Sequence, residues 1–371
     1  MKIGIITWFS GTNYGTHLQA IALQAFLREM NHHVEVINYE VDVPQKRPVI
    51  KRIMNQPRKF INNLAYKRFD SQIQLRNNKL KAIIKSNCIL TDKIECDEEF
   101  VRKSNEFDLL ICGGDQIWNP NWYHRFYYAD YDAITTRKIS YAPSIGVDEI
   151  PKNQIENIRR SIEKFDYISI REKKGAEVVA NLFDGEKKVE PVIDPAFLLN
   201  KNEWNEICKI KSKKVSYRYV LSMFLTDNQH HWKAAKRFAD KENCRLVVIP
   251  YCGFSYMQKA EIAADAGLED VIALIREAEY ILTDSFHITA LAIIYHKQFY
   301  TFQRFKEVEF FSTNERVRNL LEIADCSNRF INYGAKRIND MTDINYKKIV
   351  PKLNKVIEES KKYLERAIGE E

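Results

Sequence analysis

The amino-terminal stretch decides the fold class. Residues 2–39 read KIGIITWFSGTNYGTHLQAIALQAFLREMNHHVEVINY. The apolar run Lys2–Trp8 predicts a buried strand, and the glycine-bearing loop Ser10–Gly15 follows it. His17–Met30 places apolar residues at helical spacing, and His33–Tyr39 predicts a second strand. Strand, loop, helix and strand form the unit of a doubly wound parallel sheet, which binds ligands beyond the carboxyl ends of its strands.

The same alternation continues along the rest of the chain. Further strands are predicted at 107–112, 138–142, 167–170, 219–224, 245–250, 280–283 and 298–302, and helical patterns separate most of them. A length of 371 residues suggests two domains, at about 150 residues for each. We therefore expect an α/β fold of two Rossmann-type doubly wound domains facing a cleft. The expected domains are residues 1–200 and residues 201–371, and the second ends in a long charged helix.

Composition narrows the classes of protein. Hydrophobic residues make up 45% of the chain, and no apolar run approaches the roughly 18–20 residues that span a bilayer. The first apolar run is too short for a signal peptide, so we expect a cytoplasmic protein. The 7 cysteines are odd in number and lack a C-x-x-C pair, which argues against a disulfide framework or a zinc site. No glycine motif for NAD or ATP is present, and we expect neither a metal nor a bound cofactor.

One segment carries most of the positive charge. Residues 46–85 contain twelve Lys or Arg and one acid, Asp70, which gives a net charge of +11, whereas the other 331 residues sum to −4. Apolar residues such as Phe60 and Ile61 recur at helical spacing, so we expect a basic amphipathic insertion in the first domain. Residues 50–75 fit an anionic membrane surface, at the inner face of the plasma membrane. A solvated helix is an equal alternative, and nucleic acid fits less well because no recognition motif accompanies the charge.

Four polar clusters follow predicted strands, where sheets of this kind bind ligands. They are Thr12-Asn13-Tyr14-Gly15, Gly113-Gly114-Asp115-Gln116-Ile117-Trp118-Asn119, Ser169-Ile170-Arg171-Glu172 and Thr283-Asp284-Ser285-Phe286-His287. Each cluster has a structural alternative, because glycine pairs form turns, Asp115 is a common cap, and Arg171 with Glu172 can form a solvated pair. Their shared position at strand ends favours a functional interpretation.

The last of these clusters has the chemistry of an anion site. Ser285 is the expected cap of the helix that follows it. The N–H groups and the dipole of a helix amino terminus favour phosphate or carboxylate. His287 supplies a charge or a proton at the same place.

Ordered motifs along residues 1–325 resemble the polysaccharide pyruvyl transferase family. Besides the opening strand, the matching segments are Asn13-Tyr14-Gly15, Leu18-Gln19-Ala20, Gly114–Asn119, Tyr141–Gly146, Ser169–Glu172 with Gly175, Asp194-Pro195 with Leu198-Leu199 and Trp204, Thr283–His287, and Asn314-Glu315-Arg316 with Leu320-Leu321. The sequence departs from the family at Gly114, where the family commonly has Ser, and at Ile288, where it usually has Gly.

The resemblance implies a GT-B-like arrangement and transfer of pyruvate from phosphoenolpyruvate to a sugar, with formation of a cyclic ketal. The implied acceptor is a bacterial surface polysaccharide or its lipid-linked precursor. For that chemistry we assign the acid to His287, the base or acceptor-orienting role to Asp115, and a donor clamp to Arg171. The expected substrate-binding residues are Asn13, Tyr14, Gly15, His17, Gly114, Gln116, Trp118, Glu172, Asp284, Ser285, Phe286 and Arg316. His17 is the reserve candidate for the acid.

Two other functions stay open at this point. A GT-B glycosyltransferase would place the phosphates of a nucleotide sugar at the same helix amino terminus. A non-catalytic binding protein of envelope assembly would depend on its surfaces alone. In that case, changes at Arg171 and His287 would leave its function intact.

Overall fold

A computed structural model of the chain describes residues 1–39, 66–210, 216–306, 314–338 and 342–369. The chain forms two compact units. Unit 1 consists of residues 1–45, 84–199 and 351–371, and unit 2 consists of residues 46–83 and 200–350. Two segments are grouped differently from the expected division, because residues 66–83 join unit 2 and the carboxyl-terminal residues from 351 join unit 1.

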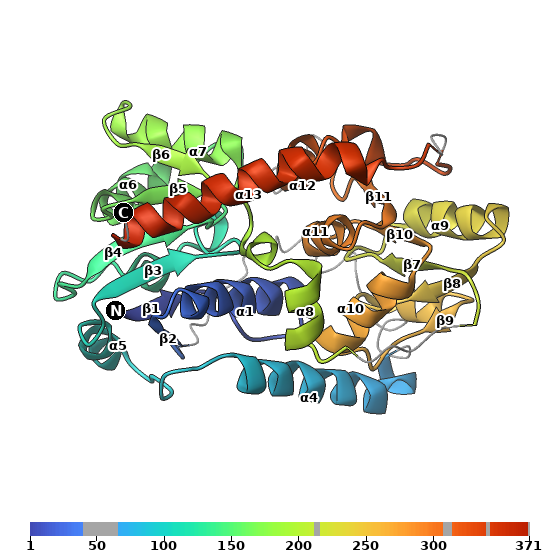
Figure 1. The fold of residues 1–371 in the computed structure, drawn as a ribbon, viewed down its shortest axis with the longest axis horizontal. Coiled ribbons are helices and arrows are strands. Elements are labelled where there is room, and N and C mark those ends of the chain that lie inside the picture. Colours follow the sequence, from blue (N-terminus) through green and yellow to red (C-terminus); the bar gives the residue numbers. More distant parts are fainter. Residues whose placement is uncertain (40–65, 211–215, 307–313, 339–341, 370–371) are drawn as a thin grey trace. The chain divides into compact units, whose positions relative to one another are not determined.

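Unit 1 is built on parallel strands (Figure 1). Its sheet has the order β2-β1-β3-β4, and the strands are β1 (Lys2–Ile6), β2 (His33–Val36), β3 (Leu109–Gly113) and β4 (Arg137–Tyr141). A bridge from Ile139 to Tyr167 leads toward β5 (Ile168–Ile170), which pairs in parallel with β6 (Val189–Pro191). The central strand β3 is buried throughout, which its continuous apolar run predicts.

Helices separate the strands of unit 1. They are α1 (Tyr14–Glu29), α5 (Asp97–Ser104), α6 (Ile155–Glu163) and α7 (Lys173–Ala180). The side chain of Asn13 caps α1 by accepting a hydrogen bond from the Gly15 N–H at 3.1 Å. This cap fixes the point at which the loop after β1 ends.

The last helix explains why the carboxyl terminus belongs to unit 1. Helix α13 (Tyr346–Ile368) carries Tyr363, whose hydroxyl donates to the Ser140 carbonyl at 2.9 Å. The Ser360 hydroxyl accepts the Ile193 N–H at 2.9 Å, and the Arg137 guanidinium donates to the Ala367 carbonyl at 2.6 Å. These bonds attach the end of α13 to β4 and to the segment after β6.

Unit 2 contains a second parallel sheet, with the order β12-β11-β10-β7-β8-β9. Its strands are β7 (Tyr219–Met223), β8 (Arg245–Val248), β9 (Glu261–Ile262), β10 (Tyr280–Thr283), β11 (Gln298–Phe302) and β12 (Phe330–Ile331). Its helices are α8 (Lys201–Ile207), α9 (Gln229–Lys241), α10 (Leu268–Glu277), α11 (Phe286–Ile294) and α12 (Asn314–Ile323). The predicted α/β class and the doubly wound organisation are therefore confirmed in each unit, and the cleft expected between the units stays a prediction.

The described part of the basic segment is helical. Helix α4 (Asp70–Asn87) includes Lys79, whose ammonium group lies 2.7 Å from Asp270 and 3.3 Å from Asp265. The expected helical residues 46–65, Phe60 and Ile61 among them, lie outside the described residues. Among the residues that are described, no helix has the length and apolar character needed to cross a membrane.

Candidate functional site

The loop after β1 is held by Gln19 of α1. The amide nitrogen of Gln19 donates to the carbonyl oxygens of Trp8 (2.6 Å) and Thr16 (3.0 Å), and its amide oxygen accepts from the Thr7 hydroxyl at 3.1 Å. This buried side chain also occupies the space beside Gly114, where an added Cβ would lie 1.6 Å from Gln19 Oε1. The absence of a side chain at Gly114 therefore leaves the space that the Gln19 side chain occupies.

His17 lies at the same junction of loop and helix, and its hydrogen bond defines which ring nitrogen carries the proton. Its Nδ1 is 2.8 Å from the Asn13 carbonyl oxygen, and a carbonyl only accepts, so Nδ1 carries the proton. Burial lowers the pKa of His17, and the Asn13 carbonyl opposes that shift only in part. The ring is therefore neutral near pH 7, and Nε2 is its acceptor atom.

Asp115 joins three strand ends of unit 1. It adopts a positive φ of 47° and is 2% exposed. Its carboxylate accepts from the Thr16 hydroxyl at 3.2 Å, and its carbonyl accepts the Ser144 N–H at 2.7 Å. The first turn of α1 and the loops after β3 and β4 thus meet at this residue.

Arg171 is buried among carboxylates. Its Nε lies 3.1 Å from Glu172 Oε1, and its Nη1 lies 2.7 Å from Asp194 Oδ2. Burial by itself lowers the pKa of Arg171, but Glu172, Asp194 and Asp115 outweigh that effect and the pKa is raised. Two acidic side chains therefore form ion pairs with one guanidinium at the carboxyl edge of this sheet, and Asp115 adds a favourable electrostatic interaction.

Two further predicted residues have internal partners. Trp118 is 1% exposed, stacks on Tyr128 with ring centroids 5.1 Å apart, and donates its N–H to the Tyr127 carbonyl. Gln116 accepts from the side chain of Asn119 at 3.0 Å. The structure gives Trp118 a place in the core of unit 1, and its contact with substrate stays a prediction.

In unit 2, the Asp284 carboxylate joins two strand ends. It follows β10, and its oxygens accept from the Leu225 N–H (2.6 Å) and the Thr226 hydroxyl (2.8 Å) after β7. Burial raises the pKa of Asp284, against the opposing influence of Arg304 and these hydrogen bonds. Asp284 is 2% exposed, so it shapes the site by holding the segment after β7.

Helix α11 begins directly after this carboxylate. The Ser285 hydroxyl caps it at 3.5 Å from the Ile288 N–H, and the Ser285 N–H donates to the Thr283 hydroxyl at 3.0 Å. Phe286 and His287 form the first turn and are 6% and 5% exposed. The predicted combination of a helix amino terminus and a histidine is therefore present.

Arg304 is a candidate that the sequence motifs did not indicate. It follows β11, the neighbour of β10, and lies close enough to Asp284 to lower the pKa of that carboxyl. In the part of the chain that the structure describes, its side chain makes no hydrogen bond or ion pair, and its guanidinium carbon lies 5.0 Å from the Phe305 ring centroid. Asn314 exchanges two hydrogen bonds with Phe305, which fixes the start of α12 and its buried Arg316 at this strand end.

His231 of α9 lies behind Asp284. It is fully buried between the rings of Phe224 and Phe302, at centroid distances of 5.1 and 5.0 Å. The Asn228 amide nitrogen donates to Nε2, so the proton is on Nδ1, which lies 3.9 Å from Asp284 Oδ2. Burial lowers the pKa of His231 to about 4, although the Gln303 backbone opposes this shift.

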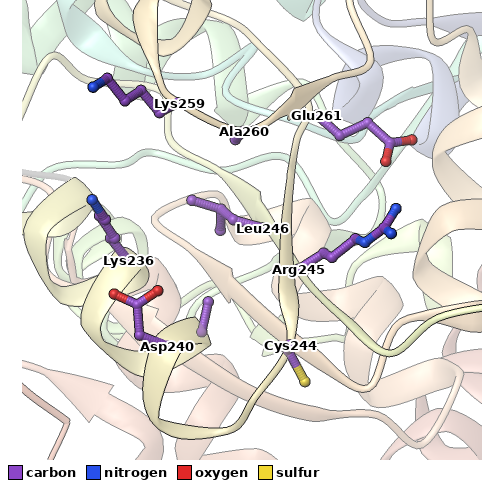
Figure 2. Close-up of a pocket in the computed structure, with 9 residues that line it drawn as sticks. Lys236, Asp240, Cys244, Arg245, Leu246, Lys259, Ala260 and Glu261 are labelled. Carbon is purple, nitrogen blue, oxygen red and sulfur yellow. The ribbon is translucent and has the colours of Figure 1, made fainter.

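A separate cavity lies at the opposite edge of the unit 2 sheet. Its volume is about 440 Å³, and Figure 2 shows Lys236 and Asp240 of α9 with Arg245 and Glu261, the first residues of β8 and β9. It is lined by the amino ends of these strands, and none of the predicted site residues reaches it. Within the described ranges, no three His, Cys, Asp or Glu side chains are arranged to hold a metal ion.

The structure thus brings the predicted residues together in two sets. In unit 1 the set is Asn13, Tyr14, Gly15, His17, Gly114, Asp115, Gln116, Arg171 and Glu172, and in unit 2 it is Asp284, Ser285, Phe286, His287 and Arg316. Sequence reasoning did not include Asp194, Arg304 and His231 among the site residues. Arg304 follows a predicted strand, so the rule of strand ends would have included it, whereas the signal for Asp194 is its place in a quoted motif.

We predict that Gly114→Ser destabilises unit 1 by about 2–4 kcal/mol, because a side chain at φ +78° is strained and meets Gln19. Urea denaturation measures the loss. In a double-mutant cycle with Gln19→Ala, the two losses should sum to more than the loss in the double variant. Strictly additive losses would show that Gln19 and position 114 do not compete for space.

We also predict that His231 makes stability depend on pH. In the folded chain the pKa of His231 is about 4, below the ordinary value of 6.5. Between these two pH values, His231 therefore binds a proton in the unfolded chain but not in the folded chain. Stability is therefore lost as the pH falls, by about 2 kcal/mol between pH 7 and pH 5. Denaturation at both pH values should show this loss in the wild type and in His230→Gln, and a smaller loss in His231→Gln. An equal loss in all three proteins would remove His231 as the cause.

Comparisons with known proteins agree with this architecture. The UDP-GlcNAc 2-epimerase of Methanocaldococcus jannaschii aligns over 95% of this chain and 92% of its own, with 12% identity and a TM-score of 0.51. The Neisseria meningitidis UDP-GlcNAc 2-epimerase bound to UDP-GlcNAc aligns over 99% of this chain and 94% of its own, with 12% identity and a TM-score of 0.49. The E. coli heptosyltransferase WaaC with ADP aligns over 98% of this chain and 99% of its own, with 10% identity and a TM-score of 0.40. At such identities the likeness concerns the fold alone, which is GT-B-like.

The family is established by sequence. Among curated proteins, no relative matches this chain. The family model described as polysaccharide pyruvyl transferase matches residues 13–304, which is most of the chain. The match spans both units and includes Asp115, Arg171 and the Asp284–His287 segment. This chain therefore belongs to the polysaccharide pyruvyl transferase family.

Proposed function

We propose that this protein transfers pyruvate from phosphoenolpyruvate to a sugar of a bacterial surface polysaccharide or its lipid-linked precursor, with formation of a cyclic ketal. The observation that carries the proposal is the pairing, in unit 2, of the α11 amino terminus and His287 with Arg304 at the neighbouring strand end. Phosphoenolpyruvate carries a carboxylate and a phosphate, and guanidinium groups and helix amino termini suit both. Family membership supports the transferred group and the class of acceptor.

The proposed reaction has three steps. His287 donates a proton to the methylene carbon of phosphoenolpyruvate, which leaves a cationic centre at the adjacent carbon. One sugar hydroxyl adds to that carbon and gives its proton to a base. The oxygen of the second sugar hydroxyl then attacks the same carbon, the C–O bond to phosphate breaks, and the hydroxyl proton passes to the leaving phosphate, which closes the ketal and releases inorganic phosphate.

The protonation states in unit 1 favour bases over acids. His17 is neutral and its single N–H is directed at the Asn13 carbonyl, so its Nε2 is suited to accept a proton. The Asp115 carboxylate, held by Thr16, is the proposed base for the sugar hydroxyl. This assignment leaves His287 as the better candidate for the acid.

Donor contacts are assigned to Arg304 and Arg316. Arg171 already bonds two carboxylates, and removing it would leave Glu172 and Asp194 uncompensated at a cost of about 3–5 kcal/mol. Its proposed role is to position these acids. The donor clamp expected of Arg171 stays a prediction.

The exposed face of α4 supports a proposal of contact with an anionic membrane at its cytoplasmic surface. Lys67 and Arg68 precede the helix, Lys81 and Lys85 lie on it, and all four are exposed. Leu75 of the same helix is 47% exposed. Each basic side chain near an anionic leaflet contributes about 1 kcal/mol. This surface suits an acceptor that is carried on a lipid.

We predict that phosphoenolpyruvate raises the melting temperature of the protein in a concentration-dependent way, by stabilising the folded state by about 2.7 kcal/mol at a hundredfold excess over Kd. Arg304→Gln should reduce the shift, because it removes a guanidinium that forms no ion pair among the described residues. Arg337→Gln, at an exposed position in the same unit, is the matched control.

The same melting assay distinguishes the alternatives. UDP-GlcNAc and other nucleotide sugars serve as competing ligands. Stabilisation by a nucleotide sugar alone would support a glycosyltransferase and contradict pyruvyl transfer. Stabilisation by neither class of ligand would support a non-catalytic binding protein. An undiminished shift in Arg304→Gln would show that Arg304 does not contact the donor.

A further inference from the structure

Three neighbouring strands of unit 2 have cross-linked carboxyl ends. The sheet order places β10 beside β7 and β7 beside β8. Asp284, after β10, accepts hydrogen bonds from Leu225 and Thr226, after β7. The next residue, Asp227, accepts the N–H of Phe254 at 3.0 Å in the short helix Gly253–Met257, which follows β8. The links therefore run in the same order as the strands.

Helix α4 is connected to the β8 end of this series. Nη1 of Arg76 donates to the Pro250 carbonyl at 3.0 Å and lies 3.2 Å from the Tyr256 hydroxyl. Tyr256 belongs to the same short helix as Phe254. The ring of Phe69 lies 5.3 Å from the Tyr256 ring, so aromatic packing accompanies the hydrogen bonds. Arg76 precedes Pro250 by 174 positions and thus holds, from a distant part of the chain, the loop that supports Asp284.

Burying the charged side chain of Arg76 carries a free-energy cost that a merely structural contact would not require. It is 7% exposed, and its Nε is buried without a hydrogen-bond partner. In the described ranges no acid forms an ion pair with it, and its two acceptors are neutral. An apolar side chain would pack at this position without the cost of burying a charge. The two directed hydrogen bonds, rather than packing alone, therefore account for an arginine at this position.

We infer that Arg76 is a positioning residue, which holds the loops after β8 and β7 so that Asp284 and the Ser285–His287 turn keep their geometry. The inference rests on the proposed function for the role of His287. The hydrogen-bonded series itself does not depend on that role. Loss of Arg76 should loosen the loops in order, first after β8 and then after β7.

Lys79 provides a matched control on the same helix. It also donates to two acceptors of unit 2, Asp265 and Asp270, but these lie after β9 and at the start of α10. Neither acceptor is bonded to Asp227 or Asp284 in the described contacts. Lys79→Met therefore weakens the attachment of α4 without breaking the series.

The test is amide hydrogen exchange in the full-length chain, read by mass spectrometry without substrate. Arg76→Met should raise exchange about tenfold in peptides covering 224–227 and 253–257, with a smaller rise at 285–288. Lys79→Met should leave these peptides unchanged. Unchanged exchange at 224–227 in Arg76→Met would overturn the inference, and so would an equal rise in both variants.

Two further variants keep the test decisive. If Arg76→Met does not fold, Tyr256→Phe removes a single acceptor and should raise exchange in the same peptides by less. Where pyruvyl transfer is measured, Arg76→Met should lower kcat about tenfold with little change in KM for phosphoenolpyruvate, and Arg76→Lys should recover part of it. A change in KM alone would contradict a positioning role. Failure of wild-type transfer would count against the proposed function, and the exchange result would still stand.

Discussion

In both units the strands pair in parallel, so every strand of a sheet delivers its carboxyl end to the same edge. That constraint places residues from distant parts of the chain within hydrogen-bonding distance. Asp115 meets Thr16 across 99 positions, and Asp284 meets Thr226 across 58 positions. The candidate site in each unit depends on this pairing, because each set combines residues from segments that are distant in the sequence.

The two edges differ in charge, and this difference gives each a separate chemical role. In unit 1 the Arg171 guanidinium is paired with two acidic side chains and lies near a third, Asp115, and His17 is neutral. In unit 2 the cation Arg304 lies near the buried Asp284, and the amino terminus of α11 follows Asp284 directly. The acidic edge suits activation of a sugar hydroxyl, and the other edge suits an anionic donor.

The sequence predicted the elements better than their grouping. Apolar runs and helical spacing located the main strands and the residues that follow them, Asp115, Arg171 and Asp284 among them. They did not show that α13 belongs to unit 1, since that depends on contacts such as Tyr363 with Ser140 over 223 positions. Arg304 has no glycine or motif beside it, and Trp118 lies within a motif although its side chain fills the core. Pattern reasoning finds strand ends, but burial and distant partners decide which side chains remain open to a ligand.

The most direct test of pyruvyl transfer follows the transferred carbon atoms. Phosphoenolpyruvate labelled with carbon-13 in its three-carbon unit is incubated with the protein and a lipid-linked saccharide fraction, and ketal carbon and inorganic phosphate are measured together. Pyruvyl transfer predicts a labelled ketal carbon in the saccharide, with one phosphate released for each label incorporated. Consumption of a nucleotide sugar while the label stays in phosphoenolpyruvate would contradict it.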